Sequence, residues 1–233
     1  MDSPYVPAPD EADVVYSAVR GIAGLVPGGE SLFSVLIRAP FEKRLEEWMQ
    51  LTDKRLRRLA DRIPSRVSTL QDDEAFASLF LSATQAAVKA HREDKRRLLA
   101  DAVEQSASGV AIEFDRQMLL MRFLDELTPS HVTLLQWIAG LHEQVEEIAS
   151  YPALYERFTN RTTSAIAADE FKLLCNDLAV RLLVRFSESL EDFPGIAERN
   201  VRVTEDSGRG PKIVMTSLGM DLLTFVGFDL SIA

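Results

Sequence analysis

The stretch LTPSHVTLL, residues 127–135, divides the chain into two parts of different character. Thr128 suits a helix N-cap, and Pro129 suits the first helical position, where its missing amide N–H costs nothing. Apolar side chains then follow at helical spacing, at Leu134, Leu135, Ile138 and Leu141. We therefore predict that a helix begins here and opens a second module over residues 128–233.

Before this stretch the pattern predicts a helical domain over residues 11–127, preceded by a flexible tail over residues 1–10. Its longest helix is expected over residues 41–63, where apolar side chains recur on one stripe and Pro64 ends the run. That stripe consists of Phe41, Leu45, Trp48, Leu56, Leu59 and Ile63. A main strut of the domain is the expected role of this helix.

Shorter helices are predicted on either side of the long one. The apolar segment 31–38 is expected to be a helix that ends at Pro40, with a strand as the alternative. Asp72-Asp73-Glu74 supplies acidic side chains suited to the start of another helix, because the helix dipole favours negative charge there. A further helix is expected to stop near Gly109.

The second module combines helices with the clearest β-pattern in the chain. A helix from Asp169 carries apolar residues and Cys175 at helical spacing. Residues 200–204 and 212–216 alternate, and the turn-like segment 205–210 joins them, which predicts a β-hairpin. The fold class is therefore mainly α: an N-terminal multi-helix region, then an α+β module with one β-hairpin and a last helix.

Composition and charge restrict the classes of function. The 233 residues are 46% apolar and 27% charged, as in a folded globular protein. A formal net charge of −10 and a pI of about 4.9 disfavour non-specific attraction to nucleic acid or anionic lipid. The single cysteine, Cys175, excludes an internal disulfide. The N-terminal sequence MDSPYVPAPDEAD lacks the features of a secretory signal, so we expect a cytoplasmic protein.

The nearest approach to a membrane segment lies in residues 14–40. Arg20, Glu30 and Arg38 interrupt it, and the Pro27-Gly28-Gly29 break leaves two pieces too short to span a bilayer. Two buried helices are the favoured interpretation. A membrane-active hairpin is the alternative.

Residue types that carry chemistry do not form a recognisable active site. His142 and Glu146 have the spacing of two ligands on one helix face, but a third metal ligand is not evident. Cys175 lies on the apolar stripe of its helix, where a thiol packs as a small hydrophobic group. The segment 207–212, SGRGPK, lacks the spacing of a phosphate-binding loop. We predict no enzyme activity, no metal and no cofactor.

Two basic clusters and several C-terminal cations stand out against the acidic composition. The residues predicted to contact a partner or a phosphate are Arg55, Arg58, Arg62, Arg92, Arg96, Arg181, Arg185, Arg209 and Lys212. The alternative is that the cations form ordinary ion pairs on the helix surface, because acidic residues are interleaved with both clusters. We favour the ion-pair interpretation.

The second module resembles a winged helix. Residues 127–135 resemble the opening helix of multiple-antibiotic-resistance-type regulators, and residues 171–184 resemble their recognition helix leading into the wing. Residues 216–221, TSLGMD, resemble the start of the helix after the wing. The resemblance implies DNA binding. Residues 129–233 contain 9 Lys or Arg against 15 Asp or Glu, however, and this acidic balance disfavours a DNA-binding module.

A second resemblance covers more of the chain. Residues 72–76, DDEAF, a following helix of small residues and the Leu127-Thr128-Pro129 start resemble bacterial Abi-alpha-type proteins, which are linked by name to abortive infection. The resemblance implies a role in phage defence or stress response. Our leading hypothesis is a non-enzymatic interaction protein with a protein partner or self-association. A DNA-binding regulator and a membrane-active effector are the alternatives.

Overall fold

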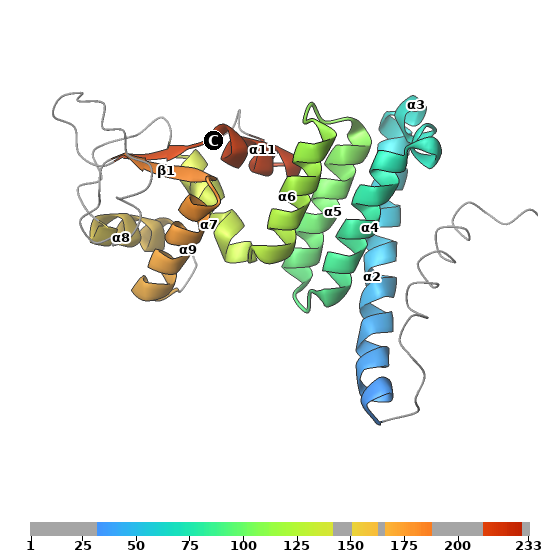
Figure 1. The fold of residues 1–233 in the computed structure, drawn as a ribbon, viewed down its shortest axis with the longest axis horizontal. Coiled ribbons are helices and arrows are strands. Elements are labelled where there is room, and N and C mark those ends of the chain that lie inside the picture. Colours follow the sequence, from blue (N-terminus) through green and yellow to red (C-terminus); the bar gives the residue numbers. More distant parts are fainter. Residues whose placement is uncertain (1–31, 142–150, 163–165, 188–211, 230–233) are drawn as a thin grey trace, which may run out of the picture. The chain divides into compact units, whose positions relative to one another are not determined.

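The computed structural model describes residues 32–141, 151–162, 166–187 and 212–229 (Figure 1). The fold is mainly helical, as predicted. The helices are α2 (Leu32–Arg62), α3 (Pro64–Val67), η1 (Leu70–Asp72), α4 (Glu74–Lys89), α5 (Glu93–Ser108), α6 (Phe114–Glu126), α7 (Pro129–Ala139), α8 (Tyr151–Arg161), α9 (Ala168–Val180) and α11 (Ser217–Phe225). The strands are β1 (Val184–Ser187) and β2 (Lys212–Met215). The chain divides into two compact units, Met1–Glu42 and Lys43–Ala233, and the second contains the core described below.

Helix α2 extends further towards the N-terminus than the sequence predicted. The expected stop at Pro40 is wrong, because α2 begins at Leu32 and continues through that proline. Proline removes one backbone hydrogen bond, but its fixed φ is close to the helical value, so a helix can continue past it at a cost. The helix ends at Arg62, and Pro64 takes the first position of α3. The predicted end of the long helix is therefore confirmed.

Local hydrogen bonds and backbone conformation define three other predicted helix boundaries, at the start of α4, the end of α5 and the start of α7. The side chain of Asp73 accepts a hydrogen bond from the Phe76 amide at 2.9 Å and caps α4. Gly109 ends α5 in the left-handed conformation, at φ +83°. Thr128 is the N-cap of α7, with Pro129 at the first position. These boundaries are confirmed, and each follows from residues within one helical turn.

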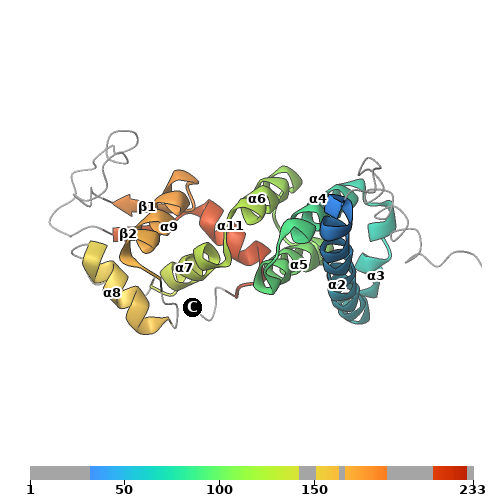
Figure 2. The same ribbon diagram turned by 90° about the horizontal axis from the view of Figure 1, so that it is seen from below.

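Helices α4, α5 and α6 pack side by side (Figures 1 and 2). The small side chains of the buried alanines in α4 and α5 let the helix backbones approach closely. Those alanines are Ala83, Ala86, Ala87, Ala100, Ala102 and Ala107. Trp48 of α2 is fully buried, and its indole N–H donates to the Thr84 hydroxyl at 3.0 Å. This hydrogen bond satisfies the polar atom of Trp48 that burial would otherwise leave unpaired.

Aromatic side chains join α7, α8 and α9. Trp137 meets Phe158 edge-to-face at 5.3 Å between ring centroids, and Phe158 lies 5.1 Å from Phe171. The ring centroids of Tyr155 and Phe171 are 5.5 Å apart, and the Tyr155 hydroxyl donates a hydrogen bond to the Ile166 carbonyl at 2.9 Å. The sequence analysis made no prediction for α8, which supplies Tyr155 and Phe158 to this cluster.

One hydrophobic core contains side chains from both sides of Thr128. It includes Leu99 and Leu120 before that residue, and Leu135 and Phe225 after it. Helix α11 contacts α5 and α6 as well as α7. The domain boundary at residue 128 stays a prediction, and the described core is continuous across it.

The β-structure contains a strand pairing that the sequence analysis did not predict. Strand β2 lies where an alternating segment was predicted, and it pairs antiparallel with β1, with Val184 opposite Met215. The predicted partner strand, 200–204, and the turn, 205–210, lie outside the described residues. Residues up to 184 were expected in the recognition helix, whereas α9 ends at Val180 and Val184 begins β1. The hairpin therefore stays a prediction.

In the part of the chain that the structure describes, no helix is long and apolar enough to cross a membrane. Most of the segment predicted as the membrane-active alternative, residues 14–31, lies outside that part.

The start of α11 fits tightly against the turn after α9. Thr216 caps the helix by accepting from the Gly219 amide at 3.0 Å, and its own amide donates to the Leu183 carbonyl at 3.2 Å. A Cβ atom on Gly219 would overlap that same carbonyl oxygen. Glycine is therefore required at residue 219, because the backbone of Leu183 approaches it closely. The packing thus explains two residues of the TSLG sequence, Thr216 as the cap and Gly219 at the close contact.

We predict that Gly219→Ala lowers the free energy of unfolding by about 3 kcal/mol, because the added methyl group must displace backbone atoms. Chemical denaturation monitored by circular dichroism measures the change. Gly140→Ala is the matched control: a Cβ there lies 3.6 Å from its nearest neighbour, in ordinary contact. That control should change stability by less than about 1 kcal/mol. Equal effects of the two substitutions would contradict the packing described here.

Candidate functional site

The predicted contact residues divide into cations used inside the protein and cations that remain exposed. Arg55 belongs to the first group. It is half-buried on α2, and its guanidinium pairs with Asp101 and, at 3.0 Å, with Glu104 of α5. Both carboxylates form ion pairs with the Arg55 guanidinium, and these ion pairs link α2 to α5. Arg55 is therefore better explained by packing than by a phosphate contact.

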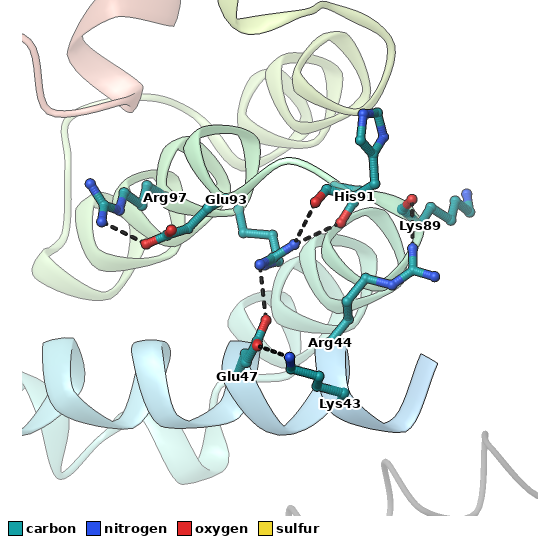
Figure 3. A network of polar contacts seen from close by, with 9 residues as sticks. Lys43, Arg44, Glu47, Lys89, His91, Glu93 and Arg97 are labelled. Atoms are coloured by element: carbon teal, nitrogen blue, oxygen red, sulfur yellow. Dashed lines mark hydrogen bonds and ion pairs between the residues drawn. The ribbon is translucent and has the colours of Figure 1, made fainter. Parts of the chain in front are cut away.

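Arg96 also serves the internal structure. Its side chain is only 10% exposed, and one guanidinium nitrogen donates to the carbonyls of Ala90 at 2.9 Å and His91 at 3.3 Å. The other donates to the carboxylate of Glu47 on α2 at 2.9 Å. Figure 3 shows that Glu47 also faces Lys43, whose Nζ atom lies 3.8 Å from a carboxylate oxygen of Glu47. Arg96 thus satisfies the carbonyls after α4 and joins α2 to α5.

The remaining predicted cations are exposed or lie outside the described residues. Arg92 pairs with Asp94 on the surface. Arg58, Arg62 and Arg185 are exposed, and within the described ranges they form no hydrogen bond or ion pair. Arg209 lies outside the described residues, as does the side chain of Lys212 in β2. The paired cations use separate acceptors on different elements, so they do not form one binding site.

Arg181 links the C-terminal end of α9 to α6. Its guanidinium lies 2.5 Å from a Glu126 oxygen and 3.3 Å from an Asp177 oxygen, and it stacks over the Phe123 ring at 5.7 Å. The hydrogen bond to Glu126 raises the pKa of Arg181, and the same bond lowers the pKa of the Glu126 carboxyl. Arg181 was predicted to contact a partner, but these contacts hold α9 in place.

A polar contact that the sequence analysis missed lies between α7 and α9. His131 is buried, and its Nε2 atom lies 3.1 Å from an Asp177 oxygen. Its Nδ1 atom accepts from the Thr128 amide at 3.1 Å and lies 2.8 Å from the Thr128 hydroxyl. Because an amide N–H only donates, Nδ1 carries no proton, and the neutral ring therefore donates from Nε2 to Asp177.

The order hydroxyl, imidazole, carboxylate is also that of a nucleophile with its base and orienting acid. Here, however, the lone pair of Nδ1 already accepts a hydrogen bond from the amide of Thr128, the N-cap residue of α7. A general base needs that lone pair for the nucleophile's proton. The contacts of His131 therefore favour a structural role, in which it caps α7 and fastens α9 to it.

Two further groups with reactive side chains are buried. The Lys95 ammonium group donates a hydrogen bond to the Leu127 carbonyl, and burial lowers the pKa of Lys95 to about 8. Cys175 is buried on α9, as predicted, and burial raises the pKa of its thiol to about 12. A thiol with this pKa stays protonated at neutral pH and is a poor nucleophile. Within the described residues, no group of three His, Cys, Asp or Glu side chains could hold a metal ion.

An exposed apolar surface on α9 is the most distinctive feature of this region. Leu173 is 65% exposed, Val180 is 68% exposed, and Leu182, just after the helix, is 51% exposed. Leu173 and Val180 are seven residues apart and share one side of the helix, opposite the buried Phe171 and Leu178. We call Leu173, Val180 and Leu182 the α9 face.

No family model, curated protein or solved structure matches this chain.

Leu182 has an unusual backbone for a leucine. Its φ is +58°, in the left-handed region, and among the described residues it is the one non-glycine with a positive φ. The Leu182 amide donates to the Ala179 carbonyl, and the Leu183 amide donates to the Leu178 carbonyl, both at 2.9 Å. These bonds form a Schellman motif, whose left-handed position is usually glycine. A leucine there costs about 1–2 kcal/mol and holds its side chain in solvent.

We predict that His131→Asn destabilises the protein by about 1–2 kcal/mol at neutral pH, because Asp177 loses its donor. Burial lowers the pKa of His131 below 6.5; nearby Arg181 and Lys95 act in the same direction, and Asp177 opposes them. A lowered pKa means that the neutral ring stabilises the fold above pH 6.5, and that this contribution is lost as the pH falls through the folded-state pKa.

The stability difference between wild type and His131→Asn should therefore shrink as the pH falls from 7.5 to 5. Denaturant titrations at several pH values measure it. A difference that stays constant or grows at low pH would show that His131 is not held neutral in the folded protein.

Proposed function

We propose that this chain is a non-enzymatic interaction protein, acting in the cytoplasm, that binds another protein through the α9 face. The observation that carries the proposal is the exposure of three large apolar side chains, one of them on a strained backbone. Leu173 and Val180 share one side of α9, and large apolar side chains exposed together on one side of a folded protein are typical of an interaction site. Strained residues concentrate at functional sites, because elsewhere selection replaces them with relaxed ones.

We further propose that α7, α8, α9, β1, β2 and α11 form a winged-helix-like module. Three helices, an antiparallel strand pair and a closing helix follow one another in the chain, and this order supports the proposal. Helix α9 then occupies the position of a recognition helix. Winged-helix scaffolds serve protein binding as well as DNA binding, so the residues on α9 decide between the two.

Those residues favour protein over DNA. The exposed large apolar side chains of α9 are Leu173 and Val180, and the exposed residues of its first turn include Asp169 and Glu170. Arg181 is held by Glu126 and Asp177. Binding to duplex DNA depends on cations that neutralise phosphates, and an apolar and acidic helix face does not provide them. A DNA-binding regulator is therefore the weaker alternative.

For the biological process, we propose a role in bacterial phage defence or stress response. The support is the resemblance of residues 72–76 and 127–129 to Abi-alpha-type proteins. Both stretches begin helices in the structure, at α4 and α7. Expression of the chain in a bacterial host should lower the plating efficiency of at least one phage in a panel. Unchanged plating across the panel, with the protein expressed and folded, would contradict this role.

The interaction proposal predicts contact between the α9 face and another protein in cells. A photo-crosslinking residue at position 173 or 180 should give discrete protein adducts after irradiation, because these side chains would lie within the interface. Gel mobility and mass spectrometry of the adducts measure this.

The matched control is the same residue at position 81. Leu81 is an exposed leucine on α4, at 39%, and lies outside the α9 face. Adducts from positions 173 and 180 but not from 81 would support the proposal. Equal labelling from all three positions, or none from any, would overturn it.

A further inference from the structure

We propose that the partner of the α9 face is a second copy of this chain, with the two α9 helices antiparallel about a twofold axis. This inference rests on the proposed interaction role of that face. It concerns which protein covers Leu173, Val180 and Leu182, and in which orientation.

The spacing of the apolar side chains suits a twofold pairing. Leu173 and Val180 are separated by two helical turns and lie on one line of the helix surface. A twofold axis that crosses this line midway passes between Asn176 and Asp177. It places Leu173 of each copy against Val180 of the other, so that the patch is complementary to itself. Such self-complementarity is the requirement for an isologous dimer interface.

Charge at the two ends of α9 selects the antiparallel orientation. Asp169 and Glu170 are exposed in the first turn, and Arg185 is exposed in β1, just after the C-terminal end. Antiparallel helices bring the acidic end of one copy near the basic end of the other, twice per dimer. A parallel arrangement would place like charges together. The helix dipoles also favour the antiparallel arrangement.

Arg181 is not the cation that meets Asp169 and Glu170 of the other copy, because its guanidinium already forms ion pairs with Glu126 and Asp177. Arg185 is exposed and has no ion pair among the described residues, so its guanidinium can meet a carboxylate of another molecule. The net charge of −10 opposes non-specific contact between copies. Self-association therefore depends on the local match of apolar and charged groups on this face.

Three apolar side chains per copy make a small interface, so we expect a dimer with a Kd on the order of 10 μM. Sedimentation velocity of the full chain over a concentration range from about 5 to about 500 μM should show a shift from monomer to dimer. Leu173→Asp should weaken dimerisation at least about 30-fold, because it replaces the apolar contact with Val180 of the other copy by a carboxylate, twice per dimer. Leu81→Asp, on α4, should leave dimerisation unchanged.

Charge exchange tests the orientation. Arg185→Glu should weaken the dimer, because Asp169 and Glu170 of the other copy then face a like charge. Adding Asp169→Lys and Glu170→Lys to Arg185→Glu should restore dimerisation, since every pair is then reversed. Restoration is not expected if the three residues act only on the fold of their own copy.

Each outcome supports or overturns the inference. Dimerisation that Leu173→Asp abolishes, and that the charge exchange restores, supports it. A monomer at every concentration overturns it, as does a dimer that is indifferent to Leu173→Asp in a folded variant. If the photo-crosslinked adducts from position 173 contain a different protein, the second-copy inference fails and the proposed interaction role stands. If no adducts form, the interaction role itself fails.

Discussion

The backbone at Leu182 and Leu183 is the constraint on which the arrangement of the second half of the chain depends. The Leu183 amide donates a hydrogen bond to the Leu178 carbonyl at the end of α9. The Leu183 carbonyl accepts a hydrogen bond from the Thr216 amide. The Thr216 hydroxyl also donates to the Leu182 carbonyl at 2.6 Å. Gly219 then packs against the Leu183 carbonyl. One turn therefore joins α9, β1, β2 and α11, and its geometry forces Leu182 into the left-handed conformation with its side chain in solvent.

Contacts along α9 itself keep the exposed side chains in a defined place. His131 binds Asp177 from α7, and Glu126 binds Arg181 from α6. Phe171 packs against the aromatic rings of α8. With its inner side fixed by these groups, the helix presents the α9 face without the entropy cost of ordering a loop on binding. The groups with reactive chemistry, Lys95 and Cys175, are buried inside the same structure instead of lining a surface.

The sequence predicted features that depend on neighbouring residues. Asp73, Gly109 and Thr128 mark helix ends because capping is local, and Cys175 was placed in the core by its helical spacing. Long-range features could not be predicted in this way. The partners Arg55 and Asp101 are separated by 46 residues, and the pairs His131–Asp177 and Val184–Met215 likewise depend on the completed fold. No local pattern marks a positive φ at Leu182, because the glycine that usually signals it is absent.

The substitution Leu182→Gly tests the central claim most directly, which is that this leucine is retained for binding at the expense of stability. Glycine relieves the backbone strain and removes the exposed side chain, and the Schellman hydrogen bonds can remain. We predict that it raises the free energy of unfolding by about 1 kcal/mol and weakens self-association in sedimentation velocity. Increased stability with unchanged association would contradict a binding role for Leu182. Decreased stability would show that its side chain supports the fold.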